Sequence, residues 1–323
     1  MLTLIAGGEV WAPEPLGRRD VLIAGRSIVA VASPGSIRVD GAELEVVDAA
    51  GLTLVPGLID PHVHLLGGGG EGGPATRAPE IRVEDIVACG VTSVIGCLGT
   101  DGITRHMTSL LAKARALEIE GIGAWIYSGS YEVPVVTLTG SIRTDLVLID
   151  KVVGAGEIAI SDHRSAQPTF DEIARLAAEC RVGGMLGGKA GILHLHLGDG
   201  ARGLELLRRL AAETEIPRTQ VVPTHCNRSP RLLDEAIEWA AAGGCVDLTA
   251  GLAAHGAGVP VVDAIRRLLA RGAPLDRVTV SSDANGSIPV FGEDGQLKAL
   301  GVASQRCSRP TRRRSTSFPG REA

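Results

Sequence analysis

Aromatic side chains are scarce in this sequence of 323 residues, which has three Phe, three Trp and two Tyr. A core must therefore be filled by Ala, Val, Leu and Ile, and proteins that read nucleic acids by stacking bases on aromatic rings are disfavoured. An excess of positive charge is also missing, because there are 32 Lys and Arg but 37 Asp and Glu, for a formal net charge of −5. We therefore expect no nucleic-acid partner.

None of the six cysteines has Cys-x-x-Cys spacing, which predicts neither a disulfide framework nor a thiolate zinc site and fits a reducing compartment. The sequence also lacks an apolar run long enough to cross a bilayer, and its amino terminus lacks a basic region followed by a long apolar stretch. These absences predict a cytoplasmic protein with no membrane partner. The cysteines are Cys89, Cys97, Cys180, Cys226, Cys245 and Cys307.

Two kinds of periodicity divide the chain. Residues 1–55 alternate apolar and polar positions between turns, which predicts a small β-layer, part of a β-sandwich. From residue 56 to residue 303, short apolar runs are followed by longer segments with helical spacing. Eight such runs predict an α/β fold, a (β/α)8 barrel of the TIM type, in which chemistry gathers at the carboxyl ends of the strands. The runs are 57–64, 91–96, 123–128, 158–161, 192–196, 221–225, 246–249 and 278–282, and the expected helices include 170–181, 204–214, 231–242 and 261–271.

Four histidines and an aspartate lie at the ends of four of these runs. His62 and His64 close the first run two residues apart, so both imidazoles point to the same face of an extended strand. His196 and His225 close the fifth and sixth runs, and Asp283 follows the eighth. This convergence predicts a metal centre. Imidazole and carboxylate ligands favour Zn²⁺, and Mn²⁺, Co²⁺ and Fe²⁺ stay open alternatives.

Together with one bridging group, these side chains provide ligands for two divalent ions. A hydroxide between the ions would be the nucleophile, because both metals lower its pKa. Asp283 would take the proton of this group and deliver it to a leaving amine.

Several segments resemble the isoaspartyl dipeptidases of the amidohydrolase superfamily, and the resemblance extends from about residue 5 to residue 303. The His-x-His pair is shared across the superfamily, whereas the four-glycine loop ending in Glu71 and the Ser-Asp-His-Arg-Ser segment are specific to isoaspartyl dipeptidases. The segments are Pro56-Gly-Leu-Ile-Asp-Pro-His-Val-His with Gly67-Gly-Gly-Gly-Glu71, Ser161-Asp-His-Arg-Ser165, Pro223-Thr-His-Cys-Asn-Arg228 and Ser281-Ser-Asp-Ala-Asn-Gly-Ser287.

The resemblance implies two metals, one bound by His62, His64 and Asp283 and the other by His196 and His225. It also implies that Glu71 receives the α-amino group of a dipeptide substrate, and that Tyr131 polarises the scissile carbonyl. A dipeptide zwitterion needs an anion for its amine and guanidinium groups for its carboxylates. The remaining implied substrate contacts are Arg164, Arg228 and Ser287 for the carboxylates, and Thr100 with the backbone near Gly69 along the pocket wall.

Each substrate contact also has a structural interpretation. Glu71 could be a solvated loop charge, Arg164 and Arg228 could form structural ion pairs, and Tyr131 could simply pack. The placement of the arginines just after the fourth and sixth runs favours function. The other histidines are interpreted as structural, namely His106, His163, His194 and His255, although His194 has the parity of His196 and His163 could orient a neighbouring group.

The sequence departs from the family at the fourth run, where familiar members place a carboxylated lysine that bridges the metals. This chain has Glu157, which we expect to open a short strand and to bridge with its two oxygens after a small backbone adjustment. Lys151 cannot take this role easily, because six residues of extended chain span about 20 Å.

A second departure concerns residues 304–323, which have no apolar period and contain six Arg. We expect a basic unstructured tail where the family would continue into the eighth barrel helix and the returning strands of the β-sandwich. A frameshift or premature stop is the favoured explanation, and a natural basic tail is the alternative. The exposed barrel flank predicts a homo-oligomer.

Three functions stay open. The first is a metallo-dipeptidase that cleaves β-aspartyl (isoaspartyl) dipeptides. The second is a cyclic amidase of the dihydroorotase or hydantoinase type, against which the Glu71 loop argues because it suits a free amine. The third is a truncated, inactive metal-binding barrel.

Overall fold

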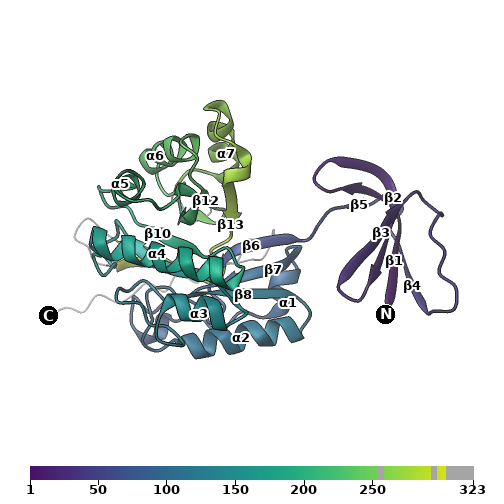
Figure 1. Ribbon diagram of the computed structural model, residues 1–323, viewed down its shortest axis with the longest axis horizontal. Coiled ribbons are helices and arrows are strands. Elements are labelled where there is room, and N and C mark those ends of the chain that lie inside the picture. Colours follow the sequence, from purple (N-terminus) through teal and green to yellow (C-terminus); the bar gives the residue numbers. More distant parts are fainter. Residues whose placement is uncertain (253–257, 292–296, 303–323) are drawn as a thin grey trace. The chain divides into compact units, whose positions relative to one another are not determined.

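A computed structural model describes residues 1–252, 258–291 and 297–302, and the chain divides into two compact units, Met1–Leu58 and Ile59–Ala323 (Figure 1). The tail at 304–323 and His255 lie outside the described residues. Each unit is a separate structural body with its own sheet.

The first unit is a five-stranded sheet in the order β3-β2-β1-β4, with β5 beside β1. Alternating residues place one side of each strand inward, and Val10 and Val21 are buried. Asp20 is also buried and accepts hydrogen bonds from the amides of Gly7 at 2.8 Å, at an irregularity within β1, and of Gly35 at 2.7 Å, in a turn. The strands are β1 (Leu2–Trp11), β2 (Pro15–Ala24), β3 (Ser27–Ala32), β4 (Leu44–Asp48) and β5 (Thr53–Leu54).

The second unit is a TIM-type barrel, and its strands coincide with the eight expected apolar runs to within a few residues, except at the fourth run. Six strands form one sheet in the order β11-β10-β9-β8-β7-β6, and β12 pairs with β13 in parallel. The amide of Cys226 donates to Asp247 O at 3.1 Å and the amide of His64 donates to Ala284 O at 2.9 Å, which joins the two sheets at both edges. The strands are β6 (Leu58–Val63), β7 (Val91–Gly96), β8 (Gly123–Ser128), β9 (Val152–Ile160), β10 (Ile192–Leu197), β11 (Val221–Thr224), β12 (Val246–Thr249) and β13 (Val278–Ser281).

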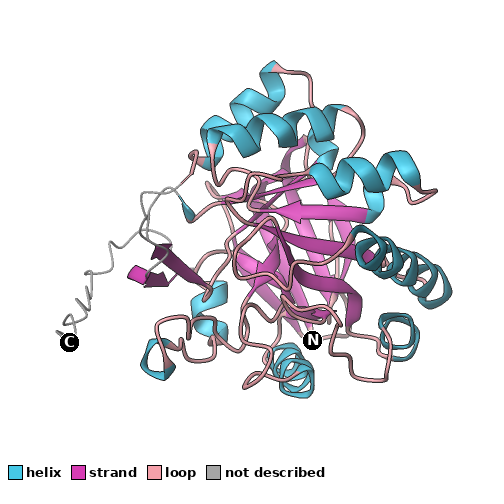
Figure 2. Ribbon diagram, turned by 90° about the vertical axis from the view of Figure 1, so that its left-hand side faces the viewer, coloured by secondary structure: helices cyan, strands magenta, loops and turns pink. Residues whose placement is uncertain are grey.

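Helices lie around the outside of these strands (Figure 2). Local sequence sets their ends: α4 begins with a capping box of Thr169 and Glu172 and ends at Gly188, which has a left-handed φ of 63°. Apolar faces such as that of α6, with Leu233 and Ile237 buried, pack against the strands. The helices are α1 (Val83–Val87), α2 (Met107–Ile119), α3 (Ile142–Leu148), α4 (Phe170–Gly187), α5 (Glu205–Glu213), α6 (Pro230–Ala241) and α7 (Val261–Ala270), with 3-10 turns η1 (Pro74–Thr76), η2 (Arg218–Gln220) and η4 (Leu275–Arg277).

The fourth barrel strand differs from the prediction. Glu157 does not open a strand from 158, because β9 already begins at Val152 and contains Glu157. Glycines at 154 and 156 lowered the apparent strand propensity, but they are needed for close packing: a Cβ on Gly156 would lie 2.8 Å from the Cβ of His194. The register against β10 shifts here, so Gly156 and Glu157 together oppose His194. Such a β-bulge redirects a side chain.

Two further differences concern helix length and a hairpin. The helix α4 continues past Arg181 to Gly187, because Gly183 and Gly184 allow close contact: a Cβ on Gly184 would lie 2.6 Å from Gly191 Cα. The strands β14 (Ser287–Phe291) and β15 (Leu297–Val302) pair antiparallel after the last barrel strand, where the sequence predicted none. A hairpin that short carries little periodic signal.

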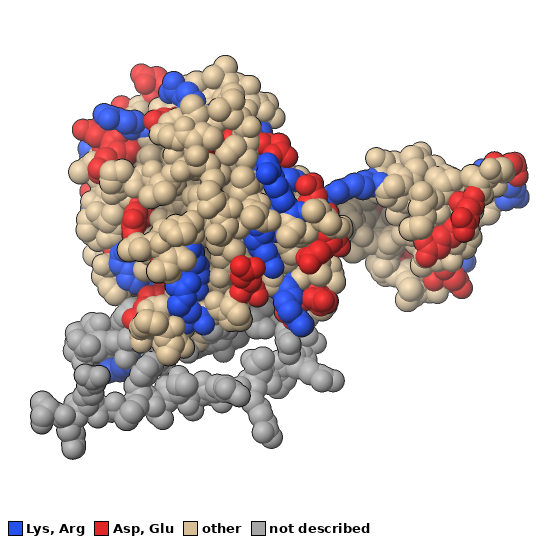
Figure 3. Space-filling model, turned by 90° about the horizontal axis from the view of Figure 1, so that it is seen from below, with Lys and Arg blue, Asp and Glu red and all other residues tan. Residues whose placement is uncertain are grey.

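Charge is mixed on the surface. Over the barrel unit, basic and acidic side chains are interspersed on the face drawn in Figure 3. Among the described residues, no helix combines the length and the apolar character that crossing a bilayer requires.

Candidate active site

The strand ends bring the predicted ligands together in one buried cluster. His62, His64, His196, His225, Glu157 and Asp283 all lie where β6, β9, β10, β11 and β13 end or have just ended, and each is at most 6% exposed. Three residues of this edge, Ser161, His225 and Asp283, have left-handed φ of 51°, 61° and 54°. Non-glycine residues adopt this conformation at a cost, and such residues gather at functional sites.

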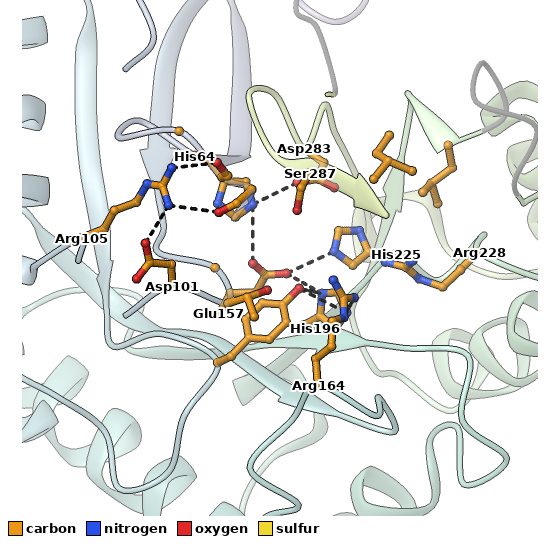
Figure 4. A pocket seen from close by; sticks show the side chains of 18 residues that line it. His64, Asp101, Arg105, Glu157, Arg164, His196, His225, Arg228, Asp283 and Ser287 are labelled. Atoms are coloured by element: carbon orange, nitrogen blue, oxygen red, sulfur yellow. Dashed lines mark hydrogen bonds and ion pairs between the residues drawn. The ribbon is translucent and has the colours of Figure 1, made fainter. Parts of the chain in front are cut away.

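Glu157 lies at the centre of the cluster (Figure 4). Its Oε1 is 2.7 Å from His196 Nδ1 and 3.2 Å from His225 Nε2. Its Oε2 is 3.4 Å from His62 Nε2 and 3.7 Å from His64 Nε2. Each carboxylate oxygen therefore lies beside a different pair of histidines, which is the arrangement that a ligand bridging two metal ions requires.

Asp283 completes one side of the cluster. Its Oδ1 is 3.1 Å from His64 Nε2 and 3.5 Å from His62 Nε2. Burial alone would raise the pKa of Asp283, but hydrogen bonds from His62 and His64 outweigh it and hold the pKa well below its ordinary value. The carboxylate is therefore ionised and can accept a proton.

The charges of the cluster suit a cation. Burial would raise the pKa of Glu157, but the charges of His62 and His196 lower it well below its usual range. Burial would lower the pKa of His64, but the negative charge of a Cys97 thiolate and the hydrogen bond to Asp283 raise it well above its usual range, so this side of the cluster favours positive charge. Burial lowers the pKa of His225 to about 3, which leaves this imidazole neutral, as metal ligation requires.

The residues fit divalent metal ions. Glu157 Oε2 is fully buried and has no hydrogen-bond partner, an arrangement that is costly unless a cation compensates the charge. One donor atom from each of Glu157, His196 and His225 lies within 4.8 Å of the others, and the same holds for His62, His64, Cys97 and Glu157. The imidazole and carboxylate donors suit zinc and neighbouring transition metals.

Glu157→Gln is expected to reduce the metal content of the dialysed protein toward one ion or none per chain, because the amide keeps the size of the carboxylate but loses the charge shared by both histidine pairs. Elemental analysis after dialysis measures this. Glu118→Gln is the matched control, since Glu118 pairs with Lys151 at 2.6 Å and does not belong to the cluster. Two tightly held ions in Glu157→Gln would show that another group bridges.

Beside the cluster lies a pocket lined by the predicted substrate residues other than Glu71, which contacts three residues of the lining. Glu71 accepts hydrogen bonds at Oε1 from Ser287 Oγ at 2.7 Å and Thr100 Oγ1 at 3.1 Å, and Arg164 Nη1 lies 3.5 Å away. Its other oxygen, Oε2, is buried and has no partner. The structure thus gathers three other predicted residues, Ser287, Thr100 and Arg164, around one buried carboxylate. The lining consists of His64, Gly67, Gly68, Gly69, Gly99, Thr100, Asp101, Arg105, Tyr131, Glu157, Arg164, His196, His225, Arg228, Leu252, Asp283, Ser287 and Ile288.

The two arginines are held differently. Arg164 donates to Asp162 from Nη2 at 2.7 Å and from Nε at 3.1 Å, so its guanidinium is already paired within the chain. Arg228 donates from Nε to Leu197 O at 3.0 Å and is half-buried. Tyr131 OH lies 2.7 Å from His196 Nδ1, and burial raises the pKa of this phenol well above its ordinary value. Tyr131 therefore stays protonated.

The fold matches known structures. A crystal structure of a β-aspartyl dipeptidase from Fervidobacterium islandicum AW-1, in complex with the β-Asp-Leu dipeptide, is 50% identical with a TM-score of 0.88, and the match covers 94% of this chain and 78% of that chain. A second structure of this enzyme is 49% identical, with a TM-score of 0.86. This chain belongs to the β-aspartyl dipeptidase family. A dihydroorotase structure, 18% identical with a TM-score of 0.56, shares the fold.

Curated sequences give a shorter match. The dihydroorotase of Streptococcus pyogenes serotype M1 is 33% identical over 113 residues, which cover 34% of this chain and 25% of the dihydroorotase. The chain thus matches about a quarter of the length of these curated relatives. No family model matches the sequence.

Sequence reasoning missed several residues that position this β-aspartyl dipeptidase-like site. Asp162 accepts from Arg164 and lies 2.9 Å from His196 Nε2, so it orients both. His194, interpreted as structural, lies with Nε2 at 2.8 Å from His62 Nδ1 and stacks on Tyr127. The hydrogen bond between His62 Nδ1 and His194 Nε2 fixes the orientation of the His62 ring, whose Nε2 faces the carboxylates.

Arg105 supports the glycine loop and was also missed. Its guanidinium, on a residue 4% exposed, donates to the carbonyls of Leu66 at 3.2 Å, Gly68 at 2.7 Å and Gly69 at 3.2 Å. The loop itself requires glycine: Gly67 and Gly69 have φ of 78° and 79°, and a Cβ on either would overlap a backbone carbonyl. Arg105 thereby holds the segment that carries Glu71.

Arg105→Gln is expected to lower the free energy of unfolding by about 2 to 4 kcal/mol, because buried carbonyls lose a charged donor, and to raise KM because Glu71 loses its support. Urea unfolding and steady-state kinetics measure the two effects. Arg209→Gln removes an exposed pair with Glu213 and should leave both the stability and KM nearly unchanged. Equal stability and KM in the two variants would contradict this role.

Proposed function

We propose that this chain is a metal-dependent hydrolase that cleaves β-aspartyl dipeptides at the side-chain amide. One observation carries the proposal: Glu71 has a buried carboxylate oxygen without a partner, on a side chain that contacts Thr100, Arg164 and Ser287 of the pocket beside the Glu157 cluster. Such an oxygen is costly unless a cationic group of a ligand pairs with it. The α-amino group of the aspartyl residue in a β-aspartyl dipeptide is free, and it has the required charge.

The charges of the pocket suit the rest of such a substrate. A β-aspartyl dipeptide has one ammonium and two carboxylates. Glu71, beside Arg164, would pair with the ammonium, and Arg164 and Arg228 on the pocket wall would pair with the carboxylates. Arg164 must share its guanidinium between Asp162 and the ligand. Ser287 and Thr100 hold Glu71 by hydrogen bonds and so fix the position of the amine.

Two divalent metal ions, zinc by preference, would be held by His62, His64 and Asp283 on one side and His196 and His225 on the other, with Glu157 between them. When bound, they would supply Lewis-acid activation of water and of the amide carbonyl. A homo-oligomer and a cytoplasmic location, both expected from the sequence, stay predictions.

The chain's own residues would handle the proton and the carbonyl. Asp283 is ionised, so it can accept a proton from the attacking water and pass it to the amine that leaves. Tyr131 stays protonated and lines the pocket beside His196, so its hydroxyl can donate a hydrogen bond to the carbonyl oxygen as negative charge develops there.

Hydrolysis of β-Asp-Leu and α-Asp-Leu by the purified full chain, loaded with Zn²⁺, tests the proposal. We expect cleavage of the β-linked dipeptide only. The match to dihydroorotases favours one second candidate, a cyclic amidase, so dihydroorotate is assayed in parallel. Turnover of dihydroorotate without turnover of β-Asp-Leu would replace the proposal with that alternative. A metal-loaded protein that cleaves none of the three would overturn both.

A further inference from the structure

Cys97 lies beside the proposed metal centre although nothing in the cysteine spacing predicted it. It directly follows β7, and its amide donates to Val63 O at 3.0 Å. Val63 ends β6 and lies between His62 and His64 in the chain. Cys97 is 1% exposed. Its Sγ is 3.9 Å from His64 Nδ1. The fold thus places a thiol among imidazoles and a carboxylate, whereas the buried Cys180 lies on α4.

We propose that Cys97 Sγ is a ligand of the metal ion held by His62 and His64, so that the two metal positions differ in chemistry. One donor atom from each of His62, His64, Cys97 and Glu157 lies within 4.8 Å of the other three. Two ligands of one zinc ion are at most about 4.4 Å apart, since zinc–sulfur and zinc–nitrogen bonds are about 2.3 Å and 2.1 Å. Small side-chain adjustments therefore suffice. The inference rests on the proposed metal centre.

A second observation points to a cation at the same place. Glu157 Oε2, the oxygen on the side of His62 and His64, is the one without a hydrogen-bond partner, whereas Oε1 is 2.7 Å from His196 Nδ1. Glu157 is 1% exposed, so water does not compensate its charge freely. An ion bound by Cys97 and the two histidines would lie against this oxygen.

With Cys97 as a ligand, the two metal positions differ in their ligand atoms, because only one of them includes a soft sulfur ligand. Among the described residues, the group formed by Glu157, His196 and His225 includes no sulfur. Thiolate favours Zn²⁺ and Co²⁺ over Mg²⁺ or Mn²⁺, so the position with Cys97 should keep zinc when the other exchanges. On binding, the metal–sulfur bond forms as the thiol proton leaves to solvent, and no electron is transferred.

Cobalt substitution of the metal-free full chain tests the inference. We expect a sulfur-to-cobalt charge-transfer absorption in the near ultraviolet that saturates while further Co²⁺ still binds. X-ray absorption of the zinc protein should show a sulfur neighbour at about 2.3 Å. Cys97→Ser should remove both signals and weaken the affinity for Zn²⁺ at one position by about tenfold or more. Cys180→Ser, which changes another fully buried cysteine, should keep both.

The possible failures are distinguishable. If Co²⁺ binds with no charge-transfer absorption in the wild-type chain, Cys97 is not a ligand, although the metal centre stands. If Cys97→Ser keeps the absorption, another cysteine is the source and the inference is wrong. If neither Co²⁺ nor Zn²⁺ binds, the proposed metal centre fails, and this inference fails with it.

Discussion

Asp283→Asn is expected to lower kcat for β-Asp-Leu by about 10³-fold or more while most of the metal stays bound, because general acid–base groups contribute about 10²- to 10⁴-fold. The amide can keep an oxygen near His64 Nε2, where Asp283 Oδ1 now lies at 3.1 Å. It cannot accept the proton of the attacking water. Stopped assays for kcat and elemental analysis for metal content measure the two effects separately.

Asp171→Asn is the matched control, because Asp171 is an exposed aspartate in the first turn of α4 and should leave kcat unchanged. If Asp283→Asn retained near-normal kcat with full metal content, Asp283 would not carry the proton. If it lost both metals along with activity, its role would be ligation, and proton transfer would have to be assigned to another group.

The candidate ligands could be predicted from the sequence because parallel strands of a barrel end at the same edge. The spacing of His62 and His64 puts both imidazoles on one face of a strand, and the position of His225 at the end of an apolar run places it at the same edge. These rules need no knowledge of distances between strands. The structure accordingly brings these residues within a few ångströms of one carboxylate.

The positioning residues could not be found this way, since their partners are remote in sequence. Arg105 contacts a loop 36 to 39 residues earlier, and nothing in its own segment indicates this. The bulge at Glu157 arises from pairing with His194 and cannot be read from β9 alone. Cys97 is different, because it directly follows the apolar run 91–96. The rule that residues at the ends of the barrel strands gather at one edge would therefore have included it.

N-acetylation of β-Asp-Leu is expected to lower kcat/KM by about 30-fold or more, because the acetylated substrate offers no ammonium group to Glu71. Leaving one partner of a buried charge pair unmatched costs about 2 to 5 kcal/mol. Glu71 can discriminate between the free and the acetylated dipeptide, since its side chain is 8% exposed and its Oε2 has no partner within the protein.

Glu71→Gln should narrow the ratio of kcat/KM between the free and acetylated dipeptides, chiefly by harming the free one, because the neutral amide no longer pairs with the amine. Glu80→Gln, at a 60% exposed glutamate, should leave the ratio unchanged. Arg228→Met should lower kcat/KM for the free and the acetylated dipeptide by similar factors, because acetylation leaves both carboxylates intact. Equal cleavage of the two dipeptides by the unaltered chain would show that Glu71 does not bind the amine, and the cyclic-amide alternative would then gain support.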